Sequence, residues 1–480
     1  MFEINYYLIF YASVEVIGIL LAMRALLRTR SPEATIAWTI SLIMMPFVSI
    51  PLYIVFGKKN FYGYVTLRKL SNQKCEEEFV EAKTFIESWK LDEEKQKSVR
   101  DIVSLEKLSE MPFIKGNKLK LFSDIQNYYD DLFLEVEKAK KVILVQTFII
   151  HGDSIGDRLA NLLIKKASEG LKVYVLFDGF GAHNFPKELM GRLKKSGVEI
   201  IPFSIMENRY NRFQLNFRNH RKIVVIDESL AFVGGANISE DYIGNNPKLS
   251  PWRDTVVKIT GPAAVSFQIP FLEDWYWQTG STISLDWEIS DKVKEDLGDQ
   301  SCLCLYSGPA DQSDTLTNTW LEVINGAKKR VWLATPYFVP NQQLLSALKI
   351  AVLKGIEVQI LFPEKPDHFY VWCAGQFYLQ KLLETGAQVL LYEKGFMHQK
   401  VILVDDDISV VGSANFDRRS LDLNFEASVI VYDKDFCLEV SQMMEQDIKN
   451  SKVLPRNYYR QKGFLFHFIS KFFNLFSPVL

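Results

Sequence analysis

The sequence predicts an α/β protein of two tandem repeats, each a mixed sheet flanked by helices, preceded by an N-terminal two-helix transmembrane hairpin. Three observations lead there. Strand-like and helix-like segments alternate in the same order twice, the pattern H-x-K-x-x-x-x-D occurs once in each half, and two apolar runs come first. A chain of 480 residues is also too long for one ordinary core. We assign the hairpin to 1–60, a polar linker or helix to 61–112, the repeats to 113–295 and 296–455, and an amphipathic C-terminal helix to 456–480.

The composition is that of a folded protein, with 48% hydrophobic and 24% charged residues. The formal net charge of -2 argues against a nucleic-acid partner, because duplex binders usually carry a basic surplus. Five cysteines without a C-x-x-C spacing indicate reduced, structural thiols rather than a metal site. We therefore expect no metal and no cofactor.

The apolar runs are Ile4–Met23 and Ile36–Phe56, each about the 20 residues that a helix needs to cross a bilayer. A signal peptide fits poorly, because basic residues follow the first run rather than precede it. A buried core hairpin is the other alternative. Basic residues follow both runs and so give no orientation: Arg24, Arg28, Arg30, Lys58, Lys59, Arg68 and Lys69. The interpretation is a multi-pass protein of the cell membrane.

The repeats are visible as two series of alternating segments. In the first half, glycines end the helix-like stretches, and strands follow them. The expected elements are strands 142–145, 173–177 and 198–201 with helices 155–168 and 187–195. The second half repeats strand signals at 331–333, 358–362 and 389–391, after a polar linker at 279–300. This order argues for strands in a mainly parallel arrangement, covered by helices, and for an internal duplication.

The repeated motif occupies 220–227 and 398–405. Alternate side chains of a strand share a face, so His220 and Lys222 point one way, as do His398 and Lys400. The motif aspartates fall on the opposite parity, where turns begin. We expect Asp227 and Asp405 to organise those turns and neighbouring groups rather than to touch a substrate.

A histidine beside a lysine suits phosphoryl chemistry. The lysine supplies positive charge for phosphate oxygens, and the histidine can act as nucleophile or as acid and base. Two such pairs facing each other allow one imidazole to attack phosphorus while the other serves the leaving and incoming groups. Small-residue turns follow both motifs, and their polar groups could stabilise the phosphate: Asn237, Ser413 and Asn415. Two lysines make a metal unnecessary.

Each half also carries a carboxylate on a later strand-like run. Asp254 lies in Pro251–Asp254 and Glu426 in Asn424–Glu426. Either one could hold a histidine in a single tautomer, as the carboxylate of a catalytic triad does. The alternative is that both are ordinary carboxylates at strand ends.

The C-terminus shows an aromatic stripe in which Phe464, Phe468, Phe472 and Phe476 recur every four residues. This spacing predicts an amphipathic helix. It could dock on the core or lie on a membrane surface, and the apolar runs at the other end favour the membrane.

At these residues the chain closely resembles the phospholipase D superfamily and, within it, the bacterial cardiolipin synthases. Both motifs match, as do the stretches Phe217–Lys222, Pro251–Asp254, Phe271–Trp275 and Asn424–Glu426, the paired N-terminal runs and the C-terminal Phe-Ser-Pro. The resemblance covers essentially the whole chain and implies two phospholipase D-like repeats.

The resemblance also implies a reaction in which two phosphatidylglycerol molecules give cardiolipin and glycerol through a phosphatidyl-histidine. It implies that His220 is the nucleophile, that His398 is the acid and base, and that Lys222 and Lys400 hold the phosphate. The motif alone does not assign the two histidine roles. The alternatives are a phospholipase D-type hydrolase or another phosphatidyltransferase, whereas the intact motifs disfavour a non-catalytic scaffold. The expected partners are phosphatidylglycerol and membrane lipids, and the oligomeric state stays open.

Overall fold

The structure is a computed structural model that describes residues 6–28, 32–57, 76–92, 102–204, 216–311 and 313–479. It forms two compact units, 1–69 with 204–217, and 70–203 with 218–480. Apart from residues 204–217, both repeats belong to the second unit. Parts of the predicted linker (61–75 and 93–101) lie outside the described residues, as do the basic residues Arg30, Lys58, Lys59, Arg68 and Lys69.

The first apolar run forms α1 (Tyr6–Arg28), whose 23 residues are enough to cross a bilayer. The second run is broken into α2 (Pro32–Met44) and α3 (Pro46–Phe56). A proline disfavours helical geometry at the residue before it, and Met45 has φ -138° and ψ 55°. Two unbroken spanning helices are therefore not confirmed, since α1 is the one described helix that is long enough.

Close packing holds α1 against α2 within the first unit. A Cβ on Gly18 would lie 2.5 Å from the Leu42 carbonyl oxygen, so this contact requires glycine. Ala22, Ala25 and Leu42 are buried between the helices. Small residues at a helix interface let the backbones approach, as they do in membrane helix pairs.

One continuous sheet of 16 strands runs through both repeats. The first repeat has the strand order β1-β9-β7-β6-β2-β3-β4, and the second has β10-β19-β17-β16-β11-β13-β14 with β20 at the edge. The bounds in the first repeat are β1 Ile114–Phe122, β2 Val142–Thr147, β3 Lys172–Asp178, β4 Glu199–Phe203, β6 Ile223–Ile226, β7 Leu230–Gly234 and β9 Val256–Thr260. Those in the second are β10 Gln300–Ser307, β11 Arg330–Ala334, β13 Glu357–Pro363, β14 Gln388–Tyr392, β16 Val401–Val404, β17 Ile408–Gly412, β19 Asn424–Tyr432 and β20 Ser451–Val453.

The matching strand orders confirm the duplication and the mixed sheet. The expectation of a mainly parallel arrangement was wrong, because antiparallel neighbours outnumber parallel ones in each repeat. In each repeat three parallel strands (β2, β3 and β4, or β11, β13 and β14) adjoin an antiparallel set. The antiparallel pair β1–β10 joins the two repeats at the centre of the sheet.

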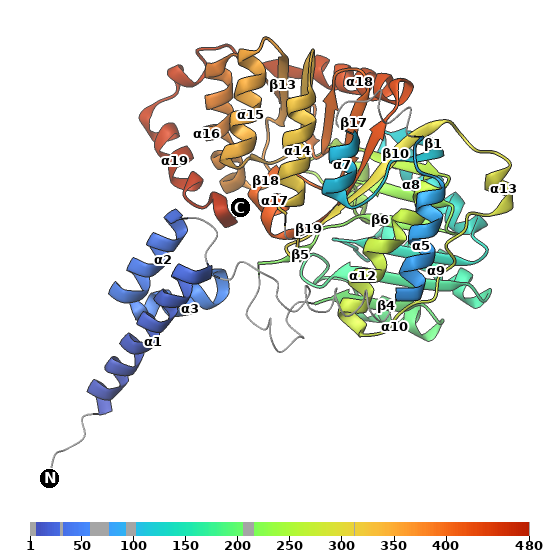
Figure 1. Cartoon of the computed structure of the whole chain (residues 1–480), viewed down its shortest axis with the longest axis horizontal. Helices are drawn as coiled ribbons and strands as arrows, with labels where there is room; N and C mark the ends of the chain where they lie inside the picture. The colour runs from blue at the N-terminus through green and yellow to red at the C-terminus, as the bar shows by residue number, and fades with distance from the viewer. Residues whose placement is uncertain are drawn as a thin grey trace. The chain divides into compact units, whose positions relative to one another are not determined.

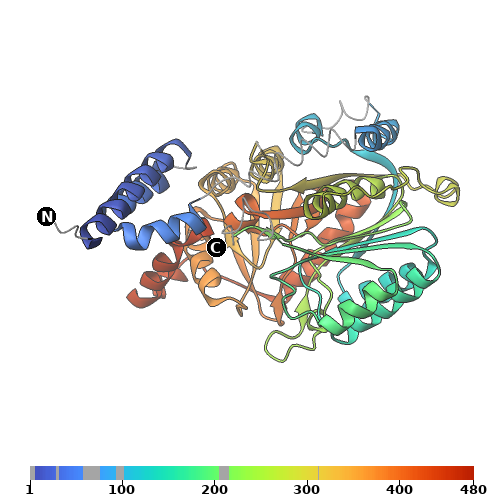
Figure 2. The same ribbon diagram turned by 90° about the horizontal axis from the view of Figure 1, so that it is seen from below.

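Helices cover both faces of the first repeat. Val173 and Val175 of β3 pack into the core beneath α8 (Ile125–Lys138), α9 (Ser154–Ser168) and α10 (Lys187–Lys195). Tyr174 between them points to the other face, where its ring lies 5.2 Å from that of Trp275 in α12 (Gln268–Thr279). Figure 2 shows the strands of this repeat running between α12 on one side and α9 and α10 on the other.

The second repeat is covered in the same way. Its α14 (Thr315–Gly326), α15 (Gln342–Leu353) and α16 (Phe369–Thr385) stand side by side (Figure 1), and α18 (Lys434–Lys449) follows β19 as α12 follows β9. This placement puts the motif strands β6 and β16 inside the sheet, between covered faces.

The described part of the predicted linker is packed rather than solvated. It contains α5 (Glu76–Ser88) and α7 (Ile102–Ser109). Ile86, Ile102 and Leu105 are buried, and the Ser104 hydroxyl donates to Glu322 of α14 at 2.5 Å. The second unit therefore includes these two helices.

Within the predicted C-terminal helix 456–480, residues Phe464–Asn474 form α19, which packs on α16. Phe476, the last phenylalanine of the stripe, follows the end of this helix. The Ser470 hydroxyl donates to the Cys373 carbonyl at 3.0 Å, so one face of the helix is docked. The stripe of phenylalanines lies on the outward face and is exposed. The four cysteines that the structure describes, Cys302, Cys304, Cys373 and Cys437, are buried free thiols.

Candidate active site

The motif aspartates are bound to backbone, as strand parity predicted. Asp227 lies in the turn between β6 and β7 with φ 49°, and its carboxylate accepts the N–H groups of Lys140, Lys141 and Val142 at 2.8, 2.7 and 3.1 Å. Asp405 occupies the equivalent turn between β16 and β17 with φ 53°, and its carboxylate binds the backbone at the start of β11. It accepts the N–H groups of Lys328, Lys329 and Arg330 at 2.9, 2.7 and 3.0 Å. Each aspartate therefore fixes the turn after its motif to the neighbouring strand.

Two short strand pairs attach each motif histidine to the other repeat. β5 (Arg218–Asn219) pairs with the start of β19, and the His220 N–H donates to the Phe425 carbonyl at 2.9 Å. β15 (Phe396–Met397) pairs with β8 (Trp252–Arg253), and the His398 N–H donates to the Arg253 carbonyl at 2.7 Å. Each histidine thus binds the backbone residue that immediately precedes a carboxylate of the opposite repeat, Glu426 or Asp254.

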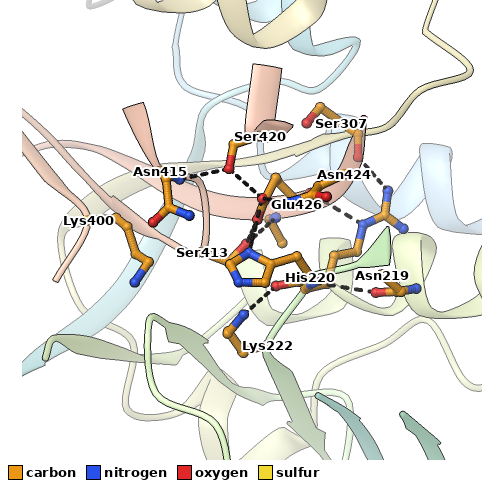
Figure 3. A network of polar contacts seen from close by, with 12 residues as sticks. Asn219, His220, Lys222, Ser307, Lys400, Ser413, Asn415, Ser420, Asn424 and Glu426 are labelled. Carbon is orange, nitrogen blue, oxygen red and sulfur yellow. Dashed lines mark hydrogen bonds and ion pairs between the residues drawn. The ribbon is translucent and has the colours of Figure 1, made fainter. Parts of the chain in front are cut away.

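The predicted carboxylates do contact the histidines, and they do so crosswise. His220 Nδ1 lies 3.0 and 2.9 Å from the two oxygens of Glu426 (Figure 3). His398 Nδ1 lies 2.7 Å from Asp254 Oδ2. A carboxylate at Nδ1 favours the tautomer that carries its proton there and leaves Nε2 with the lone pair. Both rings are therefore set to react through Nε2.

Glu426 is held by three further donors. Its oxygens accept the hydroxyls of Ser413 and Ser420 at 2.5 and 2.7 Å and the Asn424 amide at 3.2 Å (Figure 3). The Ser413 hydroxyl also accepts the Ala427 N–H at 3.0 Å. Ser413 was expected to contact phosphate, but its hydroxyl is engaged in positioning the Glu426 carboxylate.

The same turn in the first repeat has Gly235 where the second has Ser413. A Cβ there would lie 2.0 Å from Asp254 Oδ1, so glycine leaves the room for that carboxylate. Asp254 accepts the Thr255 N–H at 2.8 Å. The two repeats therefore hold their carboxylates by different means.

The two predicted asparagines differ in their surroundings. The Asn237 oxygen accepts the Ile149 N–H at 3.1 Å, and its amide nitrogen donates to the Tyr242 hydroxyl. The buried Asn415 Oδ1 has no hydrogen-bond partner among the described residues. Of this pair, Asn415 is the side chain whose amide oxygen has no partner among the described residues.

The two lysines and two histidines form one buried, coupled cluster. Lys222 donates to the His220 carbonyl at 2.7 Å, and Lys400 Nζ lies 2.9 Å from His398 Nδ1. Burial lowers the pKa of both His220 and His398 to about 4. Burial also lowers the pKa of Lys222 to about 7 and that of Lys400 to about 8. The nearby carboxylates Glu426 and Asp254 raise both pKa values and so oppose part of this effect. Both imidazoles are thus neutral near pH 7 in the free site.

Comparison with known proteins identifies the family. The model of the cardiolipin synthase, phospholipase D-like domain matches residues 132–265 and 320–448, and the phospholipase D-nuclease N-terminal model matches residues 8–58. Cardiolipin synthase A of Pseudomonas putida KT2440 is 38% identical over 471 residues, which cover 97% of this chain and 96% of that protein. The chain belongs to the cardiolipin synthase family.

Other cardiolipin synthases are similarly related. The P. putida W619 protein is 40% identical over 441 residues, covering 92% of this chain and 91% of its own. The P. aeruginosa LESB58 protein is 38% identical over 442 residues, covering 91% and 89%. The crystal structure of Haemophilus influenzae phosphatidylserine synthase shares the fold, with a TM-score of 0.62 at 17% identity over 79% of this chain and 100% of that one.

A buried ion pair stabilises the first motif of this member of the cardiolipin synthase family. It was not identified from the sequence. Arg221, between the motif histidine and lysine, contacts Asp274 of α12 at 2.7 Å. Its other nitrogens donate to the carbonyls of Glu426 and Ser307 at 3.3 and 3.0 Å. Arg221 therefore ties the first motif to β19 and β10 of the second repeat. The stretch Phe271–Trp275 contained this signal, but its contact was not visible in the sequence.

A buried ion pair between the two repeats supports the second motif. Arg253 contacts Asp447 of α18 through two bonds of 2.9 Å. Gln399, between His398 and Lys400, donates to the same aspartate at 2.7 Å. Arg253 immediately precedes Asp254, so this pair anchors the strand that carries the second carboxylate.

We expect Asp274→Ala to lower the free energy of unfolding by about 3–5 kcal/mol, because it removes the buried carboxylate that lies 2.7 Å from the buried Arg221 guanidinium. Urea unfolding of the full chain in detergent micelles measures this. The matched control is Asp130→Ala, which removes an exposed pair with Arg158 and should cost less than about 1 kcal/mol. Equal losses in the two variants would contradict the role given to Asp274.

Proposed function

We propose that the protein condenses two phosphatidylglycerol molecules into cardiolipin and glycerol by transferring a phosphatidyl group through a histidine. The observation that carries this proposal is the crosswise pairing of His220 with Glu426 and of His398 with Asp254. Two polarised imidazoles and two lysines then serve one phosphate. The names of the relatives, cardiolipin synthase A, support the lipid substrate.

In the first half-reaction, the Nε2 lone pair of His220 attacks the phosphorus of one phosphatidylglycerol. The bond between phosphorus and the oxygen of the terminal glycerol breaks, and His398 gives its proton to that oxygen. Glycerol leaves and a phosphatidyl-histidine remains. Lys222, Lys400 and the Asn415 amide would stabilise the non-bridging oxygens.

In the second half-reaction, His398 takes the proton from the terminal hydroxyl of the second phosphatidylglycerol. The oxygen attacks phosphorus and the bond to His220 Nε2 breaks. Cardiolipin forms, and both imidazoles regain their starting states. Assignment of the nucleophile to His220 rests on the family resemblance.

The electrostatics of the site suit this order of events. A neutral imidazole is needed for attack, and burial keeps the pKa of His220 low at about 4. A bound phosphate diester brings negative charge, which favours the protonated form of His398 that the leaving alcohol requires. Substrate binding itself thereby prepares the acid.

The described N-terminal helices support placement at the membrane with two spans. α2 and α3 together would form a kinked second span beside α1. The helical backbone hydrogen bonds continue through the break. The Met45 N–H donates to the Ser41 carbonyl at 2.8 Å, and the Ser49 N–H donates to the Met45 carbonyl at 2.9 Å. A site fed by lipid and shielded from water would favour transfer over hydrolysis.

The product formed from phosphatidylglycerol tests the proposal. Purified full-length protein in detergent should release glycerol and form cardiolipin in equal amounts. A phospholipase D-type hydrolase would instead give phosphatidic acid. Phosphatidic acid without cardiolipin would refute the synthase function, and use of a different acceptor alcohol would point to another phosphatidyltransferase.

We expect anion affinity to fall as pH rises above about 7. The lowered pKa values of Lys222 (about 7) and Lys400 (about 8) mean that the free site loses positive charge there, whereas both lysines are charged below that range. The competitive inhibition constant of sulfate, whose own charge stays constant, should rise by up to about tenfold per pH unit for each lysine.

Lys222→Arg is the matched variant for this pH dependence. A guanidinium stays charged, so the inhibition constant of sulfate should begin to rise only near the pKa of Lys400, about 8. An inhibition constant that does not change from pH 6 to pH 9 in the unsubstituted protein would show that the lysines do not titrate as described.

A further inference from the structure

The outward side of α19 is an apolar surface on the second unit. Phe464 is 84% exposed, Phe468 55% and Phe472 46%. We call it the C-terminal aromatic face, formed by the exposed side chains of Phe464, Leu465, Phe468, Phe472, Leu475 and Phe476. Soluble surfaces rarely gather so many large apolar side chains in one place, and such patches mark interaction sites.

The opposite side of the helix is fixed to the protein. Ser470 is buried with its hydroxyl on the Cys373 carbonyl, and His467 Nε2 lies 3.0 Å from the Tyr459 carbonyl oxygen. The Tyr378 hydroxyl donates a hydrogen bond to the Ser477 hydroxyl at 3.2 Å. The aromatic face is therefore held in one orientation on the catalytic unit.

The C-terminal segment that carries this face is basic. Residues 450–480 contain five basic side chains and no Asp or Glu, although the whole chain has a net charge of -2. The five are Lys452, Arg456, Arg460, Lys462 and Lys471. Apolar side chains flanked by basic ones are what a helix needs to lie at the boundary between anionic headgroups and acyl chains.

The face is also close to the reacting groups. Phe473, next to Phe472, packs on a small cluster of Val339, Val371 and Ala374, and Tyr337 packs on the same cluster. The ring of Tyr337 lies 6.5 Å from that of His398. This apolar cluster and the Tyr337 ring thus lie between α19 and the His398 side of the site.

From this geometry we infer that the C-terminal aromatic face inserts into the surface of an anionic bilayer and turns the His398 side of the site toward it. This inference rests on the proposed function for its lipid substrate. It adds a second membrane contact, made by the catalytic unit itself, to the one that α1 provides.

Quenching by brominated lipid tests the insertion directly. Full-length Phe468→Cys protein is labelled with an environment-sensitive fluorophore and reconstituted in nanodiscs of phosphatidylglycerol with brominated acyl chains. The label should be quenched at least about twofold more than one at Leu438→Cys, which is 57% exposed on α18. The unsubstituted protein, whose described cysteines are buried, gives the labelling background.

Two outcomes would overturn the inference. Equal quenching at the two positions would mean that the face stays in water. A blue-shifted emission at position 468 without quenching would mean that protein covers the face, either the N-terminal helices or a second copy of the chain.

Kinetics give a second readout. Phe468→Ser/Phe472→Ser should raise the apparent KM for phosphatidylglycerol in bilayers at least about fivefold, with little change in kcat. The matched control is Leu134→Ser/Leu438→Ser, which removes exposed apolar side chains from α8 and α18. With short-chain phosphatidylglycerol in detergent, all these proteins should turn over equally.

These results separate the inference from the proposed function. A protein that makes no cardiolipin even in detergent would refute the function, whereas the quenching does not depend on turnover. A KM that is unchanged in bilayers would refute the inference and leave the function intact.

Discussion

His220→Ala should abolish cardiolipin formation, with a loss of at least about 10⁴-fold in kcat, because both half-reactions pass through this nitrogen. Product formation from phosphatidylglycerol measures the loss. The matched control is His183→Ala, which removes an exposed imidazole of the first repeat. Unchanged activity in the His220 variant would contradict the assignment.

The covalent intermediate distinguishes the two histidines. A phosphatidyl ester of p-nitrophenol has a leaving group that needs no acid, so His398→Ala should still release one equivalent in a burst and retain the lipid. His220→Ala should show no burst. The adduct should be labile in acid, and finding it on His398 would reverse the roles of the two residues.

Glu426→Gln should lower kcat by about 10²–10⁴-fold, since the amide keeps the shape but no longer stabilises the charged imidazole or fixes its tautomer. Glu426 belongs to the second repeat and contacts the histidine of the first. The loss should therefore appear in the burst with the p-nitrophenyl lipid, which reports the His220 step.

The partner variant locates the effect. Asp254→Asn should leave that burst nearly unchanged and slow turnover, because Asp254 serves His398. Glu445→Gln, an exposed carboxylate of α18, is the control and should match the unsubstituted protein. A normal burst in Glu426→Gln would show that the crosswise pairing does not govern the His220 step.

Much of the fold could be predicted because its signals are local. Apolar runs and glycine stops predicted strands at 142–145 and 173–177 and a helix at 155–168. The structure confirms them as β2, β3 and α9, each one or two residues longer. The duplication followed from the same signals in the second half. The break in the second apolar run was harder to predict. The sequence stays apolar through Met45, but Pro46 moves the backbone of Met45 out of the helical region.

The site was predicted as a set of residue types, and less well as a set of contacts. The turn role of Asp227 followed from parity, and its bonds to 140–142 agree with it. Ser413 was expected on the phosphate, yet its hydroxyl holds Glu426. Asp447 was not singled out, because a lone aspartate on a helix carries no local sign that Arg253 will meet it.

The sequence by itself determined the chemistry of this protein: the histidines, lysines and carboxylates, their repetition, and the apolar segments beside them. Spacing along one strand carries that information, since alternate residues share a face. Only the tertiary structure decided which carboxylate serves which histidine. Those partners are 206 and 144 residues apart, and they meet because each motif pairs its backbone with the other repeat. The same structure showed that α19 is docked and turns its phenylalanines outward, which depends on what packs beneath it.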